Sequence, residues 1–173
     1  MSPPHPLTPS PCHAPPPPWH LQGAAVLLLQ SWRSVLSLVH YEDSPVGPYE
    51  ELAVAVLTLQ GPAVTQMLVT SEASKQGGRE NWGYPKELAP LHWESRGHHI
   101  TFRAGAREWR LRRWGPTFPI LAVGWTVQTL RGKTVRVPLR VRGWGRLAWH
   151  GRQLGLIVEH FEFTVFSSKT LAG

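Results

Sequence analysis

The sequence has almost no cysteine, few acidic residues and no long apolar run. Its single cysteine, Cys12, rules out an intrachain disulfide and any zinc site or redox pair built from thiols. The apolar run Ala24 to Leu29 is too short for a membrane span or a signal-peptide core, and no Lys or Arg precedes Arg33. We therefore expect a soluble, unexported, cytoplasmic protein that does not bind membranes.

Proline, tryptophan and positive charge are abundant instead. Of the 17 prolines, nine fall in residues 1–18, a composition that predicts an extended, disordered tail. The remaining residues, 19–173, suit one domain, because a chain of 173 residues is large enough to bury a single core. The 9 Trp and the net charge of +7 need a separate explanation.

Alternating apolar and polar residues predict strands through most of this domain. The clearest segments are residues 24–30, 35–41, 52–59, 64–70 and 159–166. The segment 52–59 is apolar almost throughout, which predicts a central strand covered on both faces. We expect a mainly β (α+β) fold, a mostly antiparallel barrel or strongly curved sheet of roughly eight to ten strands with one or two short helices.

Hairpins and a short helix complete the prediction. Residues 99–112 turn at Ala104-Gly105-Ala106, and residues 121–142 turn at Arg131-Gly132-Lys133. Pro138 predicts that the second arm of the latter hairpin is an edge strand. Ser71 can cap a helix over residues 72–76, which the Gly77-Gly78 pair is expected to end.

Arginine and tryptophan are interspersed in the two hairpins, as in some nucleic-acid grooves. Strand alternation sets the arginines on the face opposite the aromatic residues. This predicts that the tryptophans, at positions 109, 114, 125, 144 and 149, belong to the core and that the arginines form a solvated or subunit-facing surface. We therefore expect no nucleic-acid partner.

Common catalytic and cofactor motifs are missing. His98 and His99 would point to opposite faces of a strand, so they cannot share a metal ion, and no other metal-ligand spacing occurs. The chain has no Gly-x-Ser-x-Gly elbow and no glycine-rich phosphate loop. We expect neither a metal nor a cofactor.

Two stretches carry the strongest signal. The first is Tyr41-Glu42-Asp43-Ser44-Pro45-Val46-Gly47-Pro48-Tyr49-Glu50-Glu51-Leu52. The second is Ser71-Glu72-Ala73-Ser74, which leads into Gly78-Arg79-Glu80-Asn81-Trp82-Gly83-Tyr84-Pro85-Lys86-Glu87-Leu88-Ala89. In their order and separation they resemble the acetoacetate decarboxylase superfamily, and the segment that begins Trp19-His20-Leu21 resembles its opening strand.

The resemblance implies a cone-shaped β-barrel in which Lys86 forms a Schiff base with a β-keto acid such as acetoacetate. An amine attacks a carbonyl only when unprotonated, and a free lysine has a pKa of about 10.4, so a site of this kind must lower it by burial or by a nearby cation. The resemblance implies that Lys86 and Glu51 are catalytic. It also implies a substrate-binding set made up of Arg79, Trp82, Tyr84 and Tyr49.

Glu87 stands where the well-known decarboxylases have a second lysine, so this sequence resembles a divergent branch. An aldolase- or dehydratase-type relative that uses the same imine is one alternative. A non-catalytic barrel that binds a small carbonyl or apolar ligand is another. The resemblance implies a small keto acid or other carbonyl compound as the partner, and a homo-oligomer.

Overall fold

A computed structural model of the chain describes residues 14–171. These residues form eleven strands and one helix, α1. In chain order the elements are β1 (Trp19–Ser31), β2 (Ser34–Asp43), β3 (Tyr49–Thr58), β4 (Gly61–Val69), α1 (Glu72–Trp82), β5 (Lys86–Leu88), β6 (Leu91–Arg96), β7 (His99–Ala104), β8 (Arg107–Leu130), β9 (Lys133–His150), β10 (Gln153–Val165) and β11 (Lys169–Thr170).

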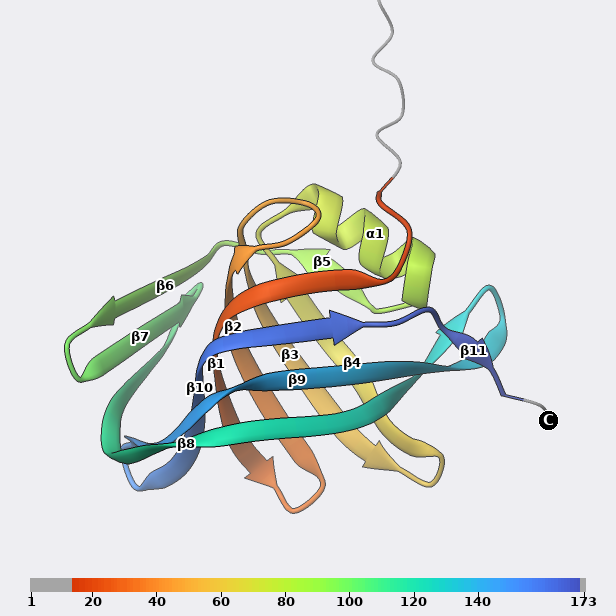
Figure 1. The fold of residues 1–173 in the computed structure, drawn as a ribbon. Helices are drawn as coiled ribbons and strands as arrows, with labels where there is room; N and C mark the ends of the chain where they lie inside the picture. The colour runs from red at the N-terminus through yellow and green to blue at the C-terminus, as the bar shows by residue number, and fades with distance from the viewer. Residues whose placement is uncertain (1–13, 172–173) are drawn as a thin grey trace, which may run out of the picture.

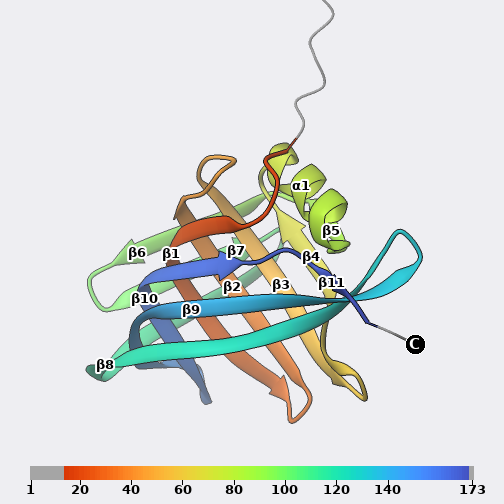
Figure 2. The same ribbon diagram turned by 45° about the vertical axis from the view of Figure 1, so that its right-hand side comes forward.

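All strands belong to one sheet, in the order β5-β4-β3-β2-β1-β10-β9-β8-β7-β6, with β11 beside β9. Neighbours are antiparallel except β4 and β5, which are parallel. Figures 1 and 2 show the sheet curled on itself, with β2 to β4 crossing behind β8 to β10 and α1 over one end. The mostly antiparallel architecture is confirmed. Among the described residues the end strands β5 and β6 do not pair, so the sheet is strongly curved without closing into a barrel.

The sheet has a hydrophobic cluster on each face. On the concave face, Ala53 of β3 packs in a cluster with Met67 and Trp82. On the convex face, the adjacent Leu52 packs in a second cluster with Leu38 and Phe102, a residue of β7. The double coverage predicted for residues 52–59 therefore holds at the start of the segment, whereas its end, from Leu57 onward, is exposed.

Pro138 does not mark an edge strand, contrary to the prediction. β9 lies between β10 and β8. Proline is tolerated there because β10 ends at Val165, which pairs with Leu139, one residue beyond Pro138. At this point the Pro138 carbonyl accepts a hydrogen bond from the N–H of Phe166 at 3.0 Å. Proline therefore occupies the place where the neighbouring strand runs out.

The prediction that the hairpin tryptophans belong to the core is also wrong for four of the five. Trp109 packs partly buried against the outer cluster, but Trp114, Trp125, Trp144 and Trp149 are exposed. Trp125 shares its face with an arginine, since the Arg136 guanidinium lies 4.6 Å from its ring centroid. Alternation shows which residues share a face, but not whether another layer covers that face. The exclusion of nucleic acid rested on this argument and stays a prediction.

The chain approaches the first strand across α1. Residues 14–18 have no helix or strand, and the Pro15 carbonyl accepts hydrogen bonds from Trp19 Nε1 at 2.8 Å and from Asn81 Nδ2 at 2.9 Å. β1 then begins at Trp19, where the domain was expected to begin. The rest of the predicted tail, residues 1–13, lies outside the described residues. No helix in residues 14–171 is long and apolar enough to cross a membrane.

Candidate active site

The curled sheet encloses a cavity of about 300 Å³ on its concave face. Strands on both sides of the curl line it, together with the end of α1, and most of the lining side chains are apolar. Among the described lining residues, the ionisable ones are Lys86, Glu51 and the tyrosines Tyr41, Tyr49 and Tyr84, and none is Arg or His. A mostly apolar pocket with a few convergent polar groups is the usual form of a small-molecule site.

Lys86 enters this cavity from the first residue of β5, opposite Met67 of β4. Pro85 lies at the centre of a three-residue turn, in which the Lys86 N–H donates to the Tyr84 carbonyl at 2.8 Å. The fixed φ of proline suits such a turn. The lysine side chain is buried, and its Nζ donates hydrogen bonds to Glu51 Oε2 and Ser74 Oγ, both at 2.9 Å.

The helix α1 is longer than predicted. Ser71 caps its start, where Oγ accepts a hydrogen bond from the Ser74 N–H at 3.2 Å. It continues through Gly77 and Gly78 and ends where Gly83 adopts the left-handed conformation. The expectation that the glycine pair ends the helix is wrong, because the role of these glycines is to allow close packing.

Each glycine of the pair makes room for one large side chain. A Cβ on Gly78 would lie 2.6 Å from Cδ and Cε of Lys86. A Cβ on Gly77 would lie 2.6 Å from ring atoms of Trp19. The helix can therefore pass directly over the lysine, and Ser74, one turn before Gly78, faces the same way.

Glu51 completes the polar end of the cavity from β3. Its Oε2 accepts the hydrogen bond from Lys86, and its Oε1 accepts one from the Tyr41 hydroxyl at 3.3 Å. The preceding residue, Glu50, turns away and pairs with His40 outside the cavity. Both oxygens of the buried Glu51 carboxylate are therefore engaged, as a desolvated carboxylate requires.

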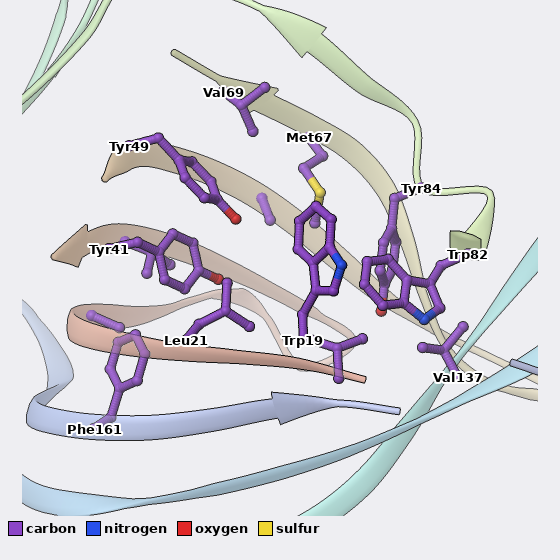
Figure 3. Packing of buried hydrophobic residues seen from close by; sticks show 14 of the residues in the cluster. Trp19, Leu21, Tyr41, Tyr49, Met67, Val69, Trp82, Tyr84, Val137 and Phe161 are labelled. Atoms are coloured by element: carbon purple, nitrogen blue, oxygen red, sulfur yellow. The ribbon is translucent and has the colours of Figure 1, made fainter. Parts of the chain in front are cut away.

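Two groups of aromatic rings line the cavity, and Figure 3 shows how these rings lie relative to one another. Tyr41 and Tyr49 lie side by side with ring centroids 4.6 Å apart, and the Lys86 Nζ lies 5.2 Å from the Tyr49 ring. Trp19 and Trp82 pack edge to face at 5.1 Å. The electron-rich face of Tyr49 therefore offers the ammonium a further favourable contact.

All three tyrosines of the chain line the cavity. Burial, followed by the charge of Glu51, raises the pKa of the Tyr41 and Tyr49 hydroxyls well above the ordinary value. Burial also raises the pKa of Tyr84, whose hydroxyl forms a hydrogen bond of 3.0 Å with Thr126 Oγ1. The phenols therefore stay neutral, and the ion pair supplies the charges of the cavity.

Arg79 and Glu87 lie outside the cavity lining. Arg79 Nε donates to the Lys86 carbonyl at 2.8 Å, and its Nη2 pairs with the Glu87 carboxylate. Successive strand residues point to opposite sides, so Glu87 points outward where Lys86 points inward. Arg79 therefore holds β5 in position from outside the cavity, where it would not contact a substrate.

Of the six predicted site residues, the structure therefore brings five together at the cavity, namely Lys86, Glu51, Tyr49, Trp82 and Tyr84. Sequence reasoning missed Ser74 and Tyr41, which contact the ion pair directly. Ser74 could have been found from its helical spacing, four residues before Gly78 and eight before Trp82. Tyr41 could have been found as the first residue of the stretch that also contains Tyr49 and Glu51.

An amine, a carboxylate and a hydroxyl thus converge in an apolar space. Transfer of one proton from Lys86 Nζ to Glu51 Oε2 would convert the ion pair into a neutral amine and a carboxylic acid. A neutral amine can attack a carbonyl carbon. Residues 14–171 contain no cluster of three or more His, Cys, Asp or Glu side chains that could hold a metal ion.

Comparisons with known proteins point to one family. Residues 32–113, which include Glu51, Ser74 and Lys86, match the family model for Acetoacetate decarboxylase (ADC). The crystal structure of an acetoacetate decarboxylase from Legionella pneumophila subsp. pneumophila str. Philadelphia 1 matches with a TM-score of 0.64 at 13% identity, over 96% of this chain and 93% of that one.

A second structure, reported in structural studies of acetoacetate decarboxylase, matches with a TM-score of 0.55 at 10% identity, over 92% of this chain and 91% of that one. A comparison with curated protein sequences gave no match. At such low identity the two structures establish a shared fold. Together with the match of residues 32–113 to the family model, that fold makes the chain similar to the acetoacetate decarboxylases.

Proposed function

We propose that the protein is a Schiff-base enzyme in which Lys86 condenses with the carbonyl group of a β-keto acid and releases its carbon dioxide. The observation that carries the proposal is the 2.9 Å contact between the buried Lys86 Nζ and Glu51 in an apolar cavity. The names of the two similar structures support a β-keto acid as the substrate class. For that family the prototype reaction converts acetoacetate to acetone and carbon dioxide.

The reaction begins with transfer of a proton from Lys86 Nζ to Glu51. The neutral amine adds to the keto carbon, and loss of water leaves an iminium ion joined to Nζ. The bond between the α-carbon and the carboxylate then breaks, and its electron pair moves into the iminium to form an enamine. Protonation of the enamine carbon and hydrolysis of the imine release the ketone and restore the lysine.

Three residues around Nζ assist these steps. Glu51 lies within hydrogen-bond distance of Nζ, so it can accept the first proton and return one during the elimination of water. Ser74 holds Nζ from the side of the helix at 2.9 Å. The Tyr41 hydroxyl, bound to the second oxygen of Glu51, orients the carboxylate.

A non-catalytic protein that binds a small carbonyl or apolar ligand in the cavity is the second candidate. It is favoured by the outward direction of residue 87 and by the lack of a second cation beside Lys86 among the described lining residues. An aldolase- or dehydratase-type relative would use the same imine and would differ in the steps after imine formation.

Reduction with sodium borohydride in the presence of acetoacetate tests the proposal. The chain has four lysines, of which Lys75, Lys133 and Lys169 are not buried. We expect peptide mass mapping to find the reduced adduct on Lys86, and carbon dioxide release without borohydride. The Lys86→Met variant should lose both signals, while Lys75→Met, a matched change on α1, should keep both.

The possible outcomes separate the candidates. An adduct on Lys86 with release of carbon dioxide supports the decarboxylase. An adduct on Lys86 without release of carbon dioxide supports imine formation but contradicts decarboxylation. If no carbonyl compound labels Lys86, whether acetoacetate, pyruvate or a longer ketone, the enzyme proposal is wrong and the non-catalytic binding protein remains.

A further inference from the structure

The cavity is polar at one end and apolar over the rest of its length. Lys86, Glu51 and the three tyrosines are all buried at the end beneath α1. The lining residues that are partly exposed, and so mark the mouth, are apolar or small, among them Leu27, Ser37, Ala55, Val64 and Val141. A molecule that reaches Lys86 through this mouth passes along an apolar wall.

Strand register gives the length of this wall. Glu51, Ala53 and Ala55 occupy alternate positions of β3 and all line the cavity. The four residue-to-residue steps from Glu51 to Ala55 span about 13 Å, at roughly 3.3 Å per step. Because Lys86 Nζ touches Glu51, this is also the approximate depth of the lysine below Ala55.

Small side chains create the space along this length. Ala53 of β3 lies opposite Ser37 of β2 and Met67 of β4, and Ala55 lies next along the same face. Ala25 of β1, which lies opposite Val39 of β2, is a further small side chain in the wall. A large apolar residue at any of these positions would fill the cavity, as core positions usually do.

A keto acid as short as acetoacetate fits this space poorly. A volume of about 300 Å³ is at the lower end of the range for drug-sized ligands and would hold about ten water molecules. Acetoacetate next to Lys86 would leave most of the apolar wall in contact with water. A longer apolar group would displace that water and bury more apolar surface.

We propose that the substrate of Lys86 carries an extended apolar tail, an alkyl chain or an aryl-alkyl group, which lies from Lys86 to the mouth along Ala53 and Ala55. The inference rests on the proposed imine at Lys86. It adds to that function the substrate class, a long-chain carbonyl compound in place of acetoacetate. The tail supplies binding free energy, and the polar end carries out the chemistry.

Imine trapping with a series of methyl ketones tests the tail. Acetone, 2-hexanone, 2-octanone and 2-decanone are the products that loss of carbon dioxide from β-keto acids would leave, and each can condense with Lys86 with loss of water. Borohydride then supplies the hydride that reduces the imine to a stable amine. We expect the ketone concentration for half-maximal labelling to fall by up to about fourfold per added methylene, the factor equivalent to ~0.8 kcal/mol of buried CH₂.

Two variants locate the tail. Ala55→Leu should raise the half-maximal concentration of 2-octanone at least tenfold and leave that of acetone unchanged. The control, Val56→Leu, adds bulk to the next residue of β3, which does not line the cavity, and should change neither. Equal labelling by acetone and 2-octanone, or an equal loss of both in Ala55→Leu, would overturn the tail proposal while the imine stands.

Failure of the imine itself can be recognised separately. If no ketone labels Lys86, the proposed function is wrong, and the tail is then judged by binding alone. For this, calorimetry with 2-decanone uses the Lys86→Met/Glu51→Gln double variant, which cannot form an imine. Binding that is at least tenfold tighter for 2-decanone than for 2-hexanone supports the apolar tail, and no binding of either ketone overturns it.

Discussion

Lys86 and Glu51 form an ion pair inside the cavity, with side chains only 5% and 7% exposed. Arg103, Glu108 and Arg110 form another ion-pair cluster on β7 and β8, where the two arginine side chains are 48% and 77% exposed. The charges of the outer cluster stay hydrated and are screened by salt. The charges of the inner pair have lost most of their water, so each depends on the other.

The difference between the two clusters bears on the proposed function. Replacing a buried ion pair by apolar residues of similar volume often leaves a protein equally stable. Stability therefore does not explain an ammonium and a carboxylate at the end of an apolar cavity, whereas the proposed proton transfer between them would. The outer cluster needs no such explanation, because exposed charges keep a basic protein soluble.

The largest expected effect comes from breaking the inner pair. Lys86→Met or Glu51→Gln alone leaves a buried polar group without its partner, and either should lower the free energy of unfolding by ~3–5 kcal/mol. The double variant should be more stable than either single variant, because no buried charge remains. Urea denaturation of the four proteins gives the coupling free energy of the pair.

Additive single effects in this cycle would contradict the mutual dependence of the two charges. Trapping of a carbonyl compound on Lys86 should meanwhile fall in Glu51→Gln, because an amide cannot accept the proton of the ammonium.

The next effect separates the two adjacent glycines of α1. In Gly77→Ala the new methyl meets the rigid ring of Trp19 and should cost about 1–3 kcal/mol of stability through overpacking. In Gly78→Ala it meets the flexible stem of Lys86, so stability should change by less than ~1 kcal/mol while imine trapping falls at least tenfold. Thermal melts and borohydride labelling of both variants measure this contrast, and equal trapping in the two would contradict it.

The burial of the three tyrosines predicts how the stability of the protein changes at alkaline pH. Because burial raises the pKa of Tyr41, Tyr49 and Tyr84, the folded chain keeps phenolic protons that the unfolded chain loses above its ordinary pKa of 10.0. The associated stability is fully present below pH 10 and is lost as the pH rises further. Urea midpoints should therefore fall above pH 10, less steeply in Tyr41→Phe.

The same three residues are the only tyrosines of the chain, so phenolate absorbance near 295 nm reports on the cavity alone. That absorbance should appear only as the protein unfolds. A phenolate signal near pH 10 in folded protein would be inconsistent with burial of the three rings.

The smallest effect belongs to the outer cluster. Arg103, and then Arg110, hold the pKa of Glu108 below its ordinary value, so any stability this pairing adds is present at neutral pH and is lost as acid protonates the carboxylate. Since these groups are exposed, Glu108→Gln should barely move the urea midpoint at pH 7, and added salt should remove any change. A loss as large as that of Glu51→Gln would erase the contrast between the two regions.

Local patterns predicted much of this fold. The alternation in residues 35–41 and 99–112 needs only neighbouring residues, and these segments form β2 and the β7–β8 hairpin as expected. The prediction failed where an element distant in sequence determines the environment of a residue. Pro138 is tolerated inside the sheet because β10 ends beside it, and Trp125 is exposed on a face where the Arg136 guanidinium lies over its ring.

The site shows the same division. Lys86, Glu51 and the aromatic residues near them lie in two short sequence stretches, and the resemblance of these stretches to a family was sufficient to group them. Ser74 and Tyr41 lie in the same two stretches, but their contacts with the ion pair depend on how α1 and β2 pack around the cavity. Arg79 lies within the same motif, yet its guanidinium turns to the outer side of β5, a direction that sequence spacing does not encode.

Among related sequences, Gly78 and Lys86 are expected to change together. A chain that replaces the long side chain at position 86 by a short one gains room for a Cβ at position 78, where alanine would strengthen the helix by ~1 kcal/mol. Drift and selection for stability would then remove the glycine. A relative with glycine at position 78 is expected to have a long side chain beneath its helix at position 86. This position can therefore help to distinguish relatives that keep the site from relatives that keep only the fold.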